Sequence, residues 1–150
     1  MSSKNQDKTL LILDLDETLI HATRNPLNQK ADFKVLDFFV YKRPDLDWFL
    51  QQIKDLYMIA VWSSAGEDYV KEIVKHIFPK DYPLEFVWAK SKTTIRKNIS
   101  IDEYGYYIED PINPFYNFKS LKKVKKKGYK LERILIVDDT PRKAEKNYGN

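Results

Sequence analysis

The stretch TLLILDLDETL occupies residues 9–19 and decides the fold class. Its first six residues form a short apolar run that ends in an acid, and this length and composition predict a buried β-strand. A second run of the same kind, RILIVDD, occupies residues 133–139. In open parallel sheets, ligands bind beyond the carboxyl ends of the strands. Two apolar strands that each finish in carboxylates therefore predict a polar site at one edge of a sheet.

The segments between these two runs alternate between strand and helix patterns. In chain order they are a strand or part of a hairpin at 33–42, a helix from Pro44 to Leu56, a strand at 57–62, a helix that stops near Pro79, and a strand at 84–88. A Lys-rich helix is predicted to start near Asn117 and another after Pro141. This alternation predicts an α/β fold, a Rossmann-like three-layer sandwich with a central parallel sheet.

The length of 150 residues suits one domain, and 43% hydrophobic residues provide a substantial core. We expect residues 1–8, which are polar, to be a flexible N-terminal segment and residues 9–150 to be the catalytic domain. No strand pattern follows the last predicted helix, so we expect this domain to be truncated at its C-terminal end. The segment 89–117 is punctuated by Gly and Pro, and it predicts either a hairpin or a long functional loop.

The composition excludes several classes of protein. There is no cysteine, which excludes disulfides, thiolate metal sites and a thiol nucleophile. No run of 18 apolar residues is present, so no membrane-spanning helix is predicted. We expect an intracellular protein, in the cytoplasm or in the nucleus of a eukaryote, without a membrane partner. The net charge of +4 favours an acidic partner without identifying it.

Four carboxylates lie at the ends of the first and last predicted strands: Asp14, Asp16, Asp138 and Asp139. If the two strand ends meet, such a cluster is unfavourable without a cation, and oxygen ligands favour Mg²⁺. A carboxylate can also attack phosphorus to form an aspartyl-phosphate. A neighbouring acid can protonate the leaving oxygen and then accept a proton from water.

The string LDLDETL resembles the DxDx(T/V) signature of the haloacid dehalogenase superfamily. Together with YKRP, VWSS and LIVDDTP, it makes residues 9–142 similar to one branch, the C-terminal-domain phosphatase-like (NLI-interacting factor-like) proteins with an FCP1 homology domain. Members of this branch dephosphorylate phosphoserine on the tail of RNA polymerase II and on other proteins. The resemblance implies a haloacid dehalogenase-type fold. The short spacing between the first two strands leaves room for a small β-hairpin insertion and for no large cap.

The resemblance also implies roles for the acidic residues. Asp14 corresponds to the nucleophile and to a metal ligand. Asp16 corresponds to the general acid/base, with its backbone carbonyl near the metal, and Thr18 to a residue that supports the loop. Asp139 corresponds to a further ligand of Mg²⁺, with Asp138 beside it.

Two further positions are implied to bind the phosphate of the substrate. Ser63, with Ser64 next to it, corresponds to the residue that hydrogen-bonds the phosphoryl oxygens. Lys119 corresponds to the lysine that balances the charge of the transferred group. It is one of seven lysines in residues 119–130, and Lys122 and Lys123 are the alternatives.

The resulting functional prediction is a magnesium-dependent phosphomonoester hydrolase that acts through an aspartyl-phosphate on phosphoserine or phosphothreonine in proteins. The segment 89–118 is longer than in the small members of the branch, so the polymerase-tail substrate is not carried over. Arg96, Tyr106 and Tyr107 in this segment either contact a substrate or serve in loop packing. Two alternatives stay open. The first is a phosphatase that acts on nucleic-acid ends or small molecules, which the lysine cluster suggests. The second is a receiver-like phosphate-binding module without enzyme activity.

Overall fold

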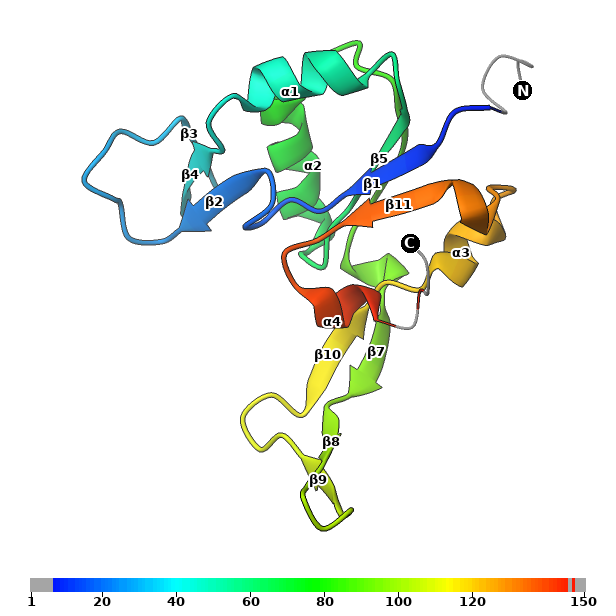
Figure 1. Ribbon diagram of the computed structural model, residues 1–150. Coiled ribbons are helices and arrows are strands. Elements are labelled where there is room, and N and C mark those ends of the chain that lie inside the picture. Colours follow the sequence, from blue (N-terminus) through cyan, green and yellow to red (C-terminus); the bar gives the residue numbers. More distant parts are fainter. Residues whose placement is uncertain (1–6, 146, 148–150) are drawn as a thin grey trace.

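The computed structural model describes residues 7–145 and 147 (Figure 1). Its centre is a parallel sheet which, in the described residues, has four strands in the order β11-β1-β5-β6. The strands are β1 (Leu10–Leu13), β5 (Met58–Trp62), β6 (Leu84–Trp88) and β11 (Ile134–Val137). Leu13 is in register with Val61 on one side and with Val137 on the other. The first and last strands are therefore neighbours and end at the same edge, as predicted.

Helices cover both faces of this sheet, because successive strand residues point to opposite sides. Leu11 and Leu13 pack with residues of α1 (Leu46–Ile53) and α2 (Glu67–Ile77) in one core cluster. Leu10 and Ile12 pack with residues of α3 (Leu121–Lys125) in a second cluster. The predicted three-layer sandwich is confirmed.

A small antiparallel sheet follows β1 and stands where larger caps would be inserted. It consists of β2 (Ile20–Thr23), β3 (Phe33–Val35) and β4 (Phe38–Lys42), in the order β2-β4-β3. The strand pattern at 33–42 is thus a hairpin. The strand β2 was not predicted, because IHAT is short and half polar; in the structure, only its Ile20 is fully buried.

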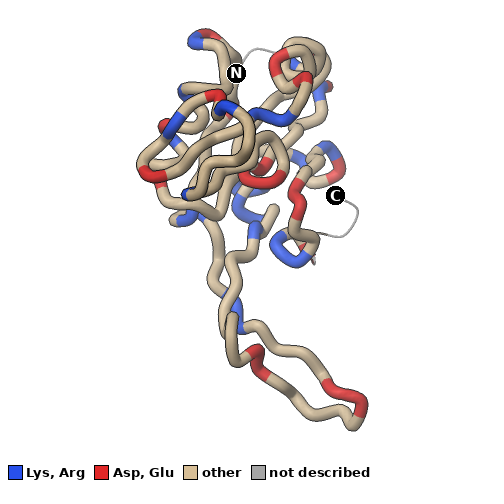
Figure 2. The backbone as a smooth tube through the Cα atoms, turned by 90° about the vertical axis from the view of Figure 1, so that its left-hand side faces the viewer, with Lys and Arg blue, Asp and Glu red and all other residues tan. Residues whose placement is uncertain are grey.

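Residues 94–118 form a long antiparallel arm that projects away from the sandwich (Figures 1 and 2). At its base, β7 (Thr94–Lys97) pairs with β10 (Phe115–Phe118), and further out β8 (Ile99–Ile101) pairs with β9 (Tyr107–Glu109). The choice between a hairpin and an irregular loop is thereby resolved in favour of the hairpin. The helix predicted to start near Asn117 begins only at Leu121, because residues 115–118 are used in the pairing with β7.

The last strand differs from the prediction in its burial. The sequence indicates a fully buried strand, but β11 lies at the edge of the sheet, and Leu135 and Val137 are 42% and 44% exposed. Both side chains point to the face that carries α1 and α2, and this part of the face is uncovered within the described residues. The prediction of complete burial is therefore wrong for this strand.

The ends of the chain are described only in part. The helix predicted after Pro141 is present as α4 (Pro141–Ala144). Residues 1–6 lie outside the described residues, so the flexible N-terminal segment stays a prediction, as do the domain limits and the C-terminal truncation. Among the described residues, no helix has the length and apolar character needed to cross a membrane.

Candidate active site

The chain turns tightly where β1 ends. The carbonyl oxygen of Leu15 accepts hydrogen bonds from the backbone N–H groups of Thr18, at 3.2 Å, and Leu19, at 2.8 Å. Glu17 has a φ of 60°, a left-handed conformation that is uncommon for residues other than glycine. The turn forms a loop that closes on itself, because Ile20, the first residue of β2, forms a parallel β-bridge with Asp16.

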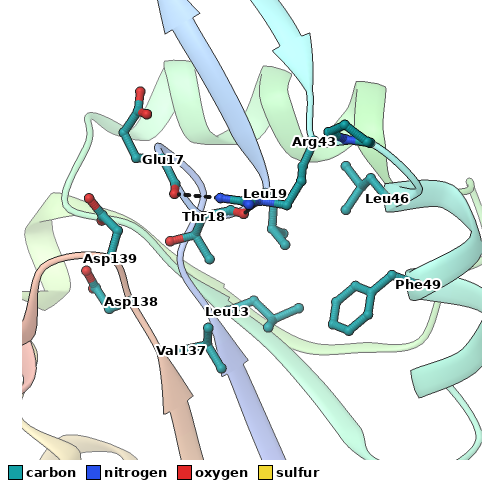
Figure 3. Close-up of a pocket in the computed structure, with 11 residues that line it drawn as sticks. Leu13, Glu17, Thr18, Leu19, Arg43, Leu46, Phe49, Val137, Asp138 and Asp139 are labelled. Carbon is teal, nitrogen blue, oxygen red and sulfur yellow. Dashed lines mark hydrogen bonds between the residues drawn. The ribbon is translucent and has the colours of Figure 1, made fainter.

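The side chain of Arg43 stabilises this turn through hydrogen bonds to its backbone. Its Nε donates to the carbonyl oxygen of Thr18 at 2.6 Å, and its guanidinium also donates to that of Glu17 at 3.2 Å. Figure 3 shows Arg43 at one side of a pocket of about 400 Å³ that has Asp138 and Asp139 at its other side. The YKRP string contains this arginine, but its contact with the loop was not foreseen.

Lys119 joins the two strand ends. Its side chain is fully buried, and its Nζ donates to Asp14 Oδ1 at 2.8 Å and to Asp138 Oδ2 at 2.5 Å. Its backbone is fixed as well, because its N–H donates to the carbonyl oxygen of Lys143 at 2.7 Å. Of the seven lysines in this region, the predicted one therefore lies at the carboxylates. The alternative Lys123 instead donates to backbone carbonyls of residues 92 and 93.

The carboxylates of Asp14, Asp138 and Asp139 form one cluster, with an oxygen from each lying within 4.8 Å of the others. Burial raises the pKa of Asp14, and the adjacent Lys119 opposes this shift. A single ammonium cannot neutralise three carboxylates. Because the donors are hard oxygen atoms in a negatively charged site, the cluster fits a divalent cation such as Mg²⁺.

Asp16 is held by a tyrosine from α2. The Tyr69 hydroxyl donates to Asp16 Oδ1 at 2.6 Å, and the Tyr69 ring packs edge-on against Phe38 of β4, with centroids 5.6 Å apart. Burial raises the pKa of Asp16, while the hydrogen bond from Tyr69 lowers it. The apolar periodicity of this helix does not point to Tyr69. Its spacing of four residues from the buried Ile73 is the signal that could have indicated that it lies on the inner face of the helix.

Ser63 and Ser64 follow β5 at the same edge of the sheet. Ser63 is buried, its N–H donates to the carbonyl oxygen of Trp88 at 2.9 Å, and its Oγ accepts a hydrogen bond from the N–H of Ala65 at 3.1 Å. The Ser64 hydroxyl is also buried and has no hydrogen-bond partner within the described residues. A buried hydroxyl without a partner is unusual, and a ligand oxygen would satisfy it.

The remaining residues considered from the sequence lie on the arm. The guanidinium of Arg96 stacks on the ring of Phe118, with Cζ 3.9 Å from the ring centroid. Tyr106 and Tyr107 are 71% and 79% exposed. The contact with Phe118 explains the position of the Arg96 side chain by packing within the arm. Packing does not explain the two exposed tyrosine side chains.

Thr18 lies close to the nucleophile candidate. Its hydroxyl donates to Asp14 Oδ2 at 3.4 Å, a long contact that leaves this oxygen weakly bound. Asp138 is more tightly held, since its Oδ1 accepts a hydrogen bond from the N–H of Thr140 at 2.9 Å. Asp139 is exposed at the rim of the cluster. Of the two carboxylates that Lys119 contacts, Asp14 has the oxygen that is less restrained by hydrogen bonds.

Comparison with known proteins identifies relatives for this arrangement. A family model described as NLI interacting factor-like phosphatase matches residues 9–150. The chain is 26% identical over 147 residues to the human carboxy-terminal domain RNA polymerase II polypeptide A small phosphatase 1, covering 93% of this chain and 48% of that protein. It is 27% identical over 139 residues to Phosphatase Herzog of Drosophila melanogaster, covering 87% of this chain and 33% of that protein.

Solved structures show the same fold. The fission yeast RNA polymerase II CTD phosphatase Fcp1 bound to beryllium fluoride superimposes with a TM-score of 0.61 at 21% identity, over 92% of this chain and 39% of the other. A second Fcp1 structure gives a TM-score of 0.60 at 21% identity, over 90% and 38% of the two chains. The chain thus spans less than half the length of these relatives.

Proposed function

Because the chain belongs to the NLI interacting factor-like phosphatase family, we propose that it is a magnesium-dependent phosphomonoester hydrolase acting on phosphoserine or phosphothreonine in proteins. The observation that carries the proposal is the contact of the buried Lys119 with both Asp14 and Asp138 at the adjoining ends of β1 and β11. Phosphoryl transfer requires positioning and neutralisation of charge, and this cluster offers both.

In the first step, an oxygen of the Asp14 carboxylate attacks phosphorus and the bond from phosphorus to the ester oxygen breaks. The departing serine or threonine oxygen takes a proton from the Asp16 carboxyl group. This carboxyl is suited to carry that proton because burial raises its pKa. In this proposal Lys119 balances the negative charge of the transferred group, and the hydroxyls of Ser63 and Ser64 bind its oxygens.

In the second step, Asp16 takes a proton from water, and the water oxygen attacks phosphorus. The bond between phosphorus and the Asp14 oxygen breaks, which releases inorganic phosphate and restores the Asp14 carboxylate and the protonated Asp16 carboxyl group. Asp14, Asp138 and Asp139 would hold Mg²⁺, and the bound ion would supply charge stabilisation to the phosphoryl oxygens. The backbone carbonyl of Asp16 is the further ligand that the family resemblance implies.

Protein substrates are favoured by the surroundings of the site. Between β1 and α1 the chain forms only the small β2-β4-β3 sheet, so within the described residues no large cap closes over Asp14 and Asp16. A small metabolite is usually enclosed on most of its surface by its pocket. An open site instead admits a phosphorylated side chain on a large molecule, as the names of the phosphatase relatives suggest.

The test is a screen of phosphoserine peptides, phosphorylated oligonucleotide ends and sugar phosphates with and without Mg²⁺. We expect magnesium-dependent hydrolysis of the phosphopeptides, and Asp14→Asn should remove it while circular dichroism shows an intact fold. Faster hydrolysis of oligonucleotide ends than of any phosphopeptide would favour the alternative substrate. Full activity of Asp14→Asn would refute the mechanism itself.

A further inference from the structure

The end of the arm, residues 98–114, is referred to below as the outer arm. It exposes large apolar side chains that a surface hairpin does not need: Ile99, Ile101, Tyr104, Tyr106, Tyr107, Ile108 and Ile112, each at least 40% exposed. Exposed apolar side chains that gather on one element mark interaction sites more often than scattered ones do. Figure 2 shows the outer arm standing clear of the rest of the molecule.

These side chains are ordered into a face. In the β8–β9 pair, Ile101 is opposite Tyr107 and Ile99 is opposite Glu109. Residues directly opposite each other point to the same side of a sheet, as do residues two apart along a strand. Ile99, Ile101 and Tyr107 therefore share one face with Glu109, and the three apolar side chains on this face are 40%, 64% and 79% exposed.

The outer arm has a defined shape because its polar groups bond internally. The buried side-chain amide of Asn98 donates to Asp110 Oδ2 at 3.1 Å and to the carbonyl oxygen of Asn113 at 2.8 Å. At the tip, Asp102 Oδ1 accepts hydrogen bonds from the N–H groups of Tyr104 and Tyr106 at 2.9 and 2.8 Å. A preorganised hairpin can receive a partner with little loss of conformational entropy.

The charge of the outer arm is opposite to that of the chain as a whole. Residues 98–114 contain four acids, Asp102, Glu103, Glu109 and Asp110, and no Lys or Arg, although the chain has a net charge of +4. Figure 2 shows the red segments at the end of the arm, and Glu109 is paired at 2.9 Å with Lys97, which lies just outside this range. A partner that carries Lys or Arg next to apolar residues would complement both properties.

The backbone offers a way to bind such a partner. In the described residues, β8 and β9 pair only with each other, so each strand keeps one edge whose backbone groups are unpaired. An extended peptide can add to such an edge as a third strand, with alternate side chains on the apolar face. At the other end of the arm, β10 leads directly into Lys119 at the candidate site. At about 3.3 Å per residue, the path from Thr94 to Ile101 reaches roughly 23 Å.

We propose that the outer arm binds an extended, basic segment of the phosphoprotein substrate, about 7–10 residues away from the phosphorylated side chain in the substrate sequence. This inference rests on the proposed function, because it requires a protein substrate. A segment bound on the arm raises the effective concentration of its own phosphoserine at Asp14. The arm thereby selects substrates by a sequence remote from the phosphate.

The first experiment measures binding without catalysis. A fluorescent, unphosphorylated peptide of alternating Arg and Val is titrated with the protein, and fluorescence anisotropy is recorded. We expect saturable binding that weakens by about tenfold or more in the double variant Ile101→Thr/Tyr107→Thr, in which threonine keeps the strand propensity. Ile112→Thr is the matched control, because Ile112 is 84% exposed and lies outside the β8–β9 pair. Equal binding by all three proteins would overturn the proposal.

The second experiment measures catalysis. Phosphoserine peptides carry the Arg/Val segment, or the same segment with Glu for Arg, about 8 residues from the phosphoserine. We expect the wild type to prefer the Arg peptide through a lower KM, the double variant to lose this preference, and hydrolysis of p-nitrophenyl phosphate to be the same in all proteins. Light scattering tests self-association. A dimer of the wild type that the double variant does not form would assign the arm to self-association and overturn the proposal. Hydrolysis of p-nitrophenyl phosphate without hydrolysis of any phosphopeptide would refute the proposed protein substrate instead, and the binding experiment would still decide the role of the arm.

Discussion

The hydroxyl of Tyr69 donates to Asp16 Oδ1 at 2.6 Å, although the two residues are 53 positions apart in the chain. The contact joins α2 to the loop after β1. Since Asp16 has to present its carboxyl group first to the leaving oxygen and then to water, the hydrogen bond restricts it to one orientation. Tyr69 is thus a candidate positioning residue for the general acid/base.

The variant Tyr69→Phe tests this role. We expect kcat to fall by about tenfold with little change in KM, because losing the orientation of an acid/base removes part of its rate contribution. Tyr82→Phe is the control, since the Tyr82 hydroxyl donates to the carbonyl oxygen of Leu50, a residue of the core cluster on that face. Steady-state kinetics with p-nitrophenyl phosphate separate the two parameters. An unchanged kcat in Tyr69→Phe would remove Tyr69 from the mechanism.

Replacement of Lys119 should damage both stability and activity. The variant Lys119→Met leaves Asp14 and Asp138 buried without their shared cation, and removal of one partner of a buried ion pair costs about 3–5 kcal/mol. Chemical denaturation measures this loss, and the hydrolysis assay measures the loss of turnover. Lys125→Met, an exposed change on α3, should leave both close to wild type. A Lys119→Met protein as stable and active as wild type would contradict the assigned charge balance.

The effect of pH on stability should depend on Mg²⁺. Without Mg²⁺, the contribution of Asp14 to stability should decrease as pH rises. The stabilisation by bound Mg²⁺ should instead increase as pH rises. Burial raises the pKa of Asp14 above the ordinary value of an aspartate, so as pH rises the metal-free folded protein keeps a proton on this group that the unfolded chain has already lost. The contribution of Asp14 to stability is therefore lost as pH rises through its folded pKa. Bound Mg²⁺ requires the carboxylate form, so it should stabilise the protein at neutral pH and progressively less in acid.

Thermal unfolding between about pH 4 and pH 8, with and without Mg²⁺, measures this linkage. We expect the increase in Tm caused by Mg²⁺ to shrink as pH falls and to be much smaller at neutral pH in Asp139→Asn. Glu85→Gln is a matched control, because Glu85 lies on β6 and accepts a hydrogen bond from Tyr129 on the opposite side of the sheet from α1 and α2. An increase in Tm that is the same at every pH would show that Mg²⁺ binds away from these carboxylates.

The sheet and the position of the acids could be predicted because their signals are local. A run such as LLIL followed by an acid has few alternatives to a buried strand, and two such runs in an α/β pattern bring Asp14 and Asp138 to one edge. The motif resemblance pointed to Lys119 among its neighbours. Its burial and its simultaneous contact with two carboxylates became visible only in three dimensions.

Other features depend on contacts between distant segments, which no local pattern encodes. Tyr69 contacts Asp16, and Arg43 contacts the carbonyls of residues 17 and 18, because helix, hairpin and loop meet in space. A hairpin in this region was one of two alternatives, but the helix start near Asn117 was wrong because residues 115–118 pair with β7. The exposure of Val137 likewise depends on the position of β11 at the edge of the sheet in the described residues, and not on the apolar composition of β11 itself.

The central claim is that the carboxylate of Asp14 bonds to phosphorus. The most direct measurement is to mix the Asp16→Asn variant with radiolabelled p-nitrophenyl phosphate, whose leaving group needs no proton from Asp16, and Mg²⁺, quench in acid, and measure the label on the protein. Borohydride reduction and mass spectrometry then locate the phosphorylated residue. We predict a phosphoenzyme labelled at Asp14, which borohydride converts to homoserine. Label on Ser63 or on any other residue, or rapid hydrolysis by the wild type with no labelled protein in either form, would contradict this account.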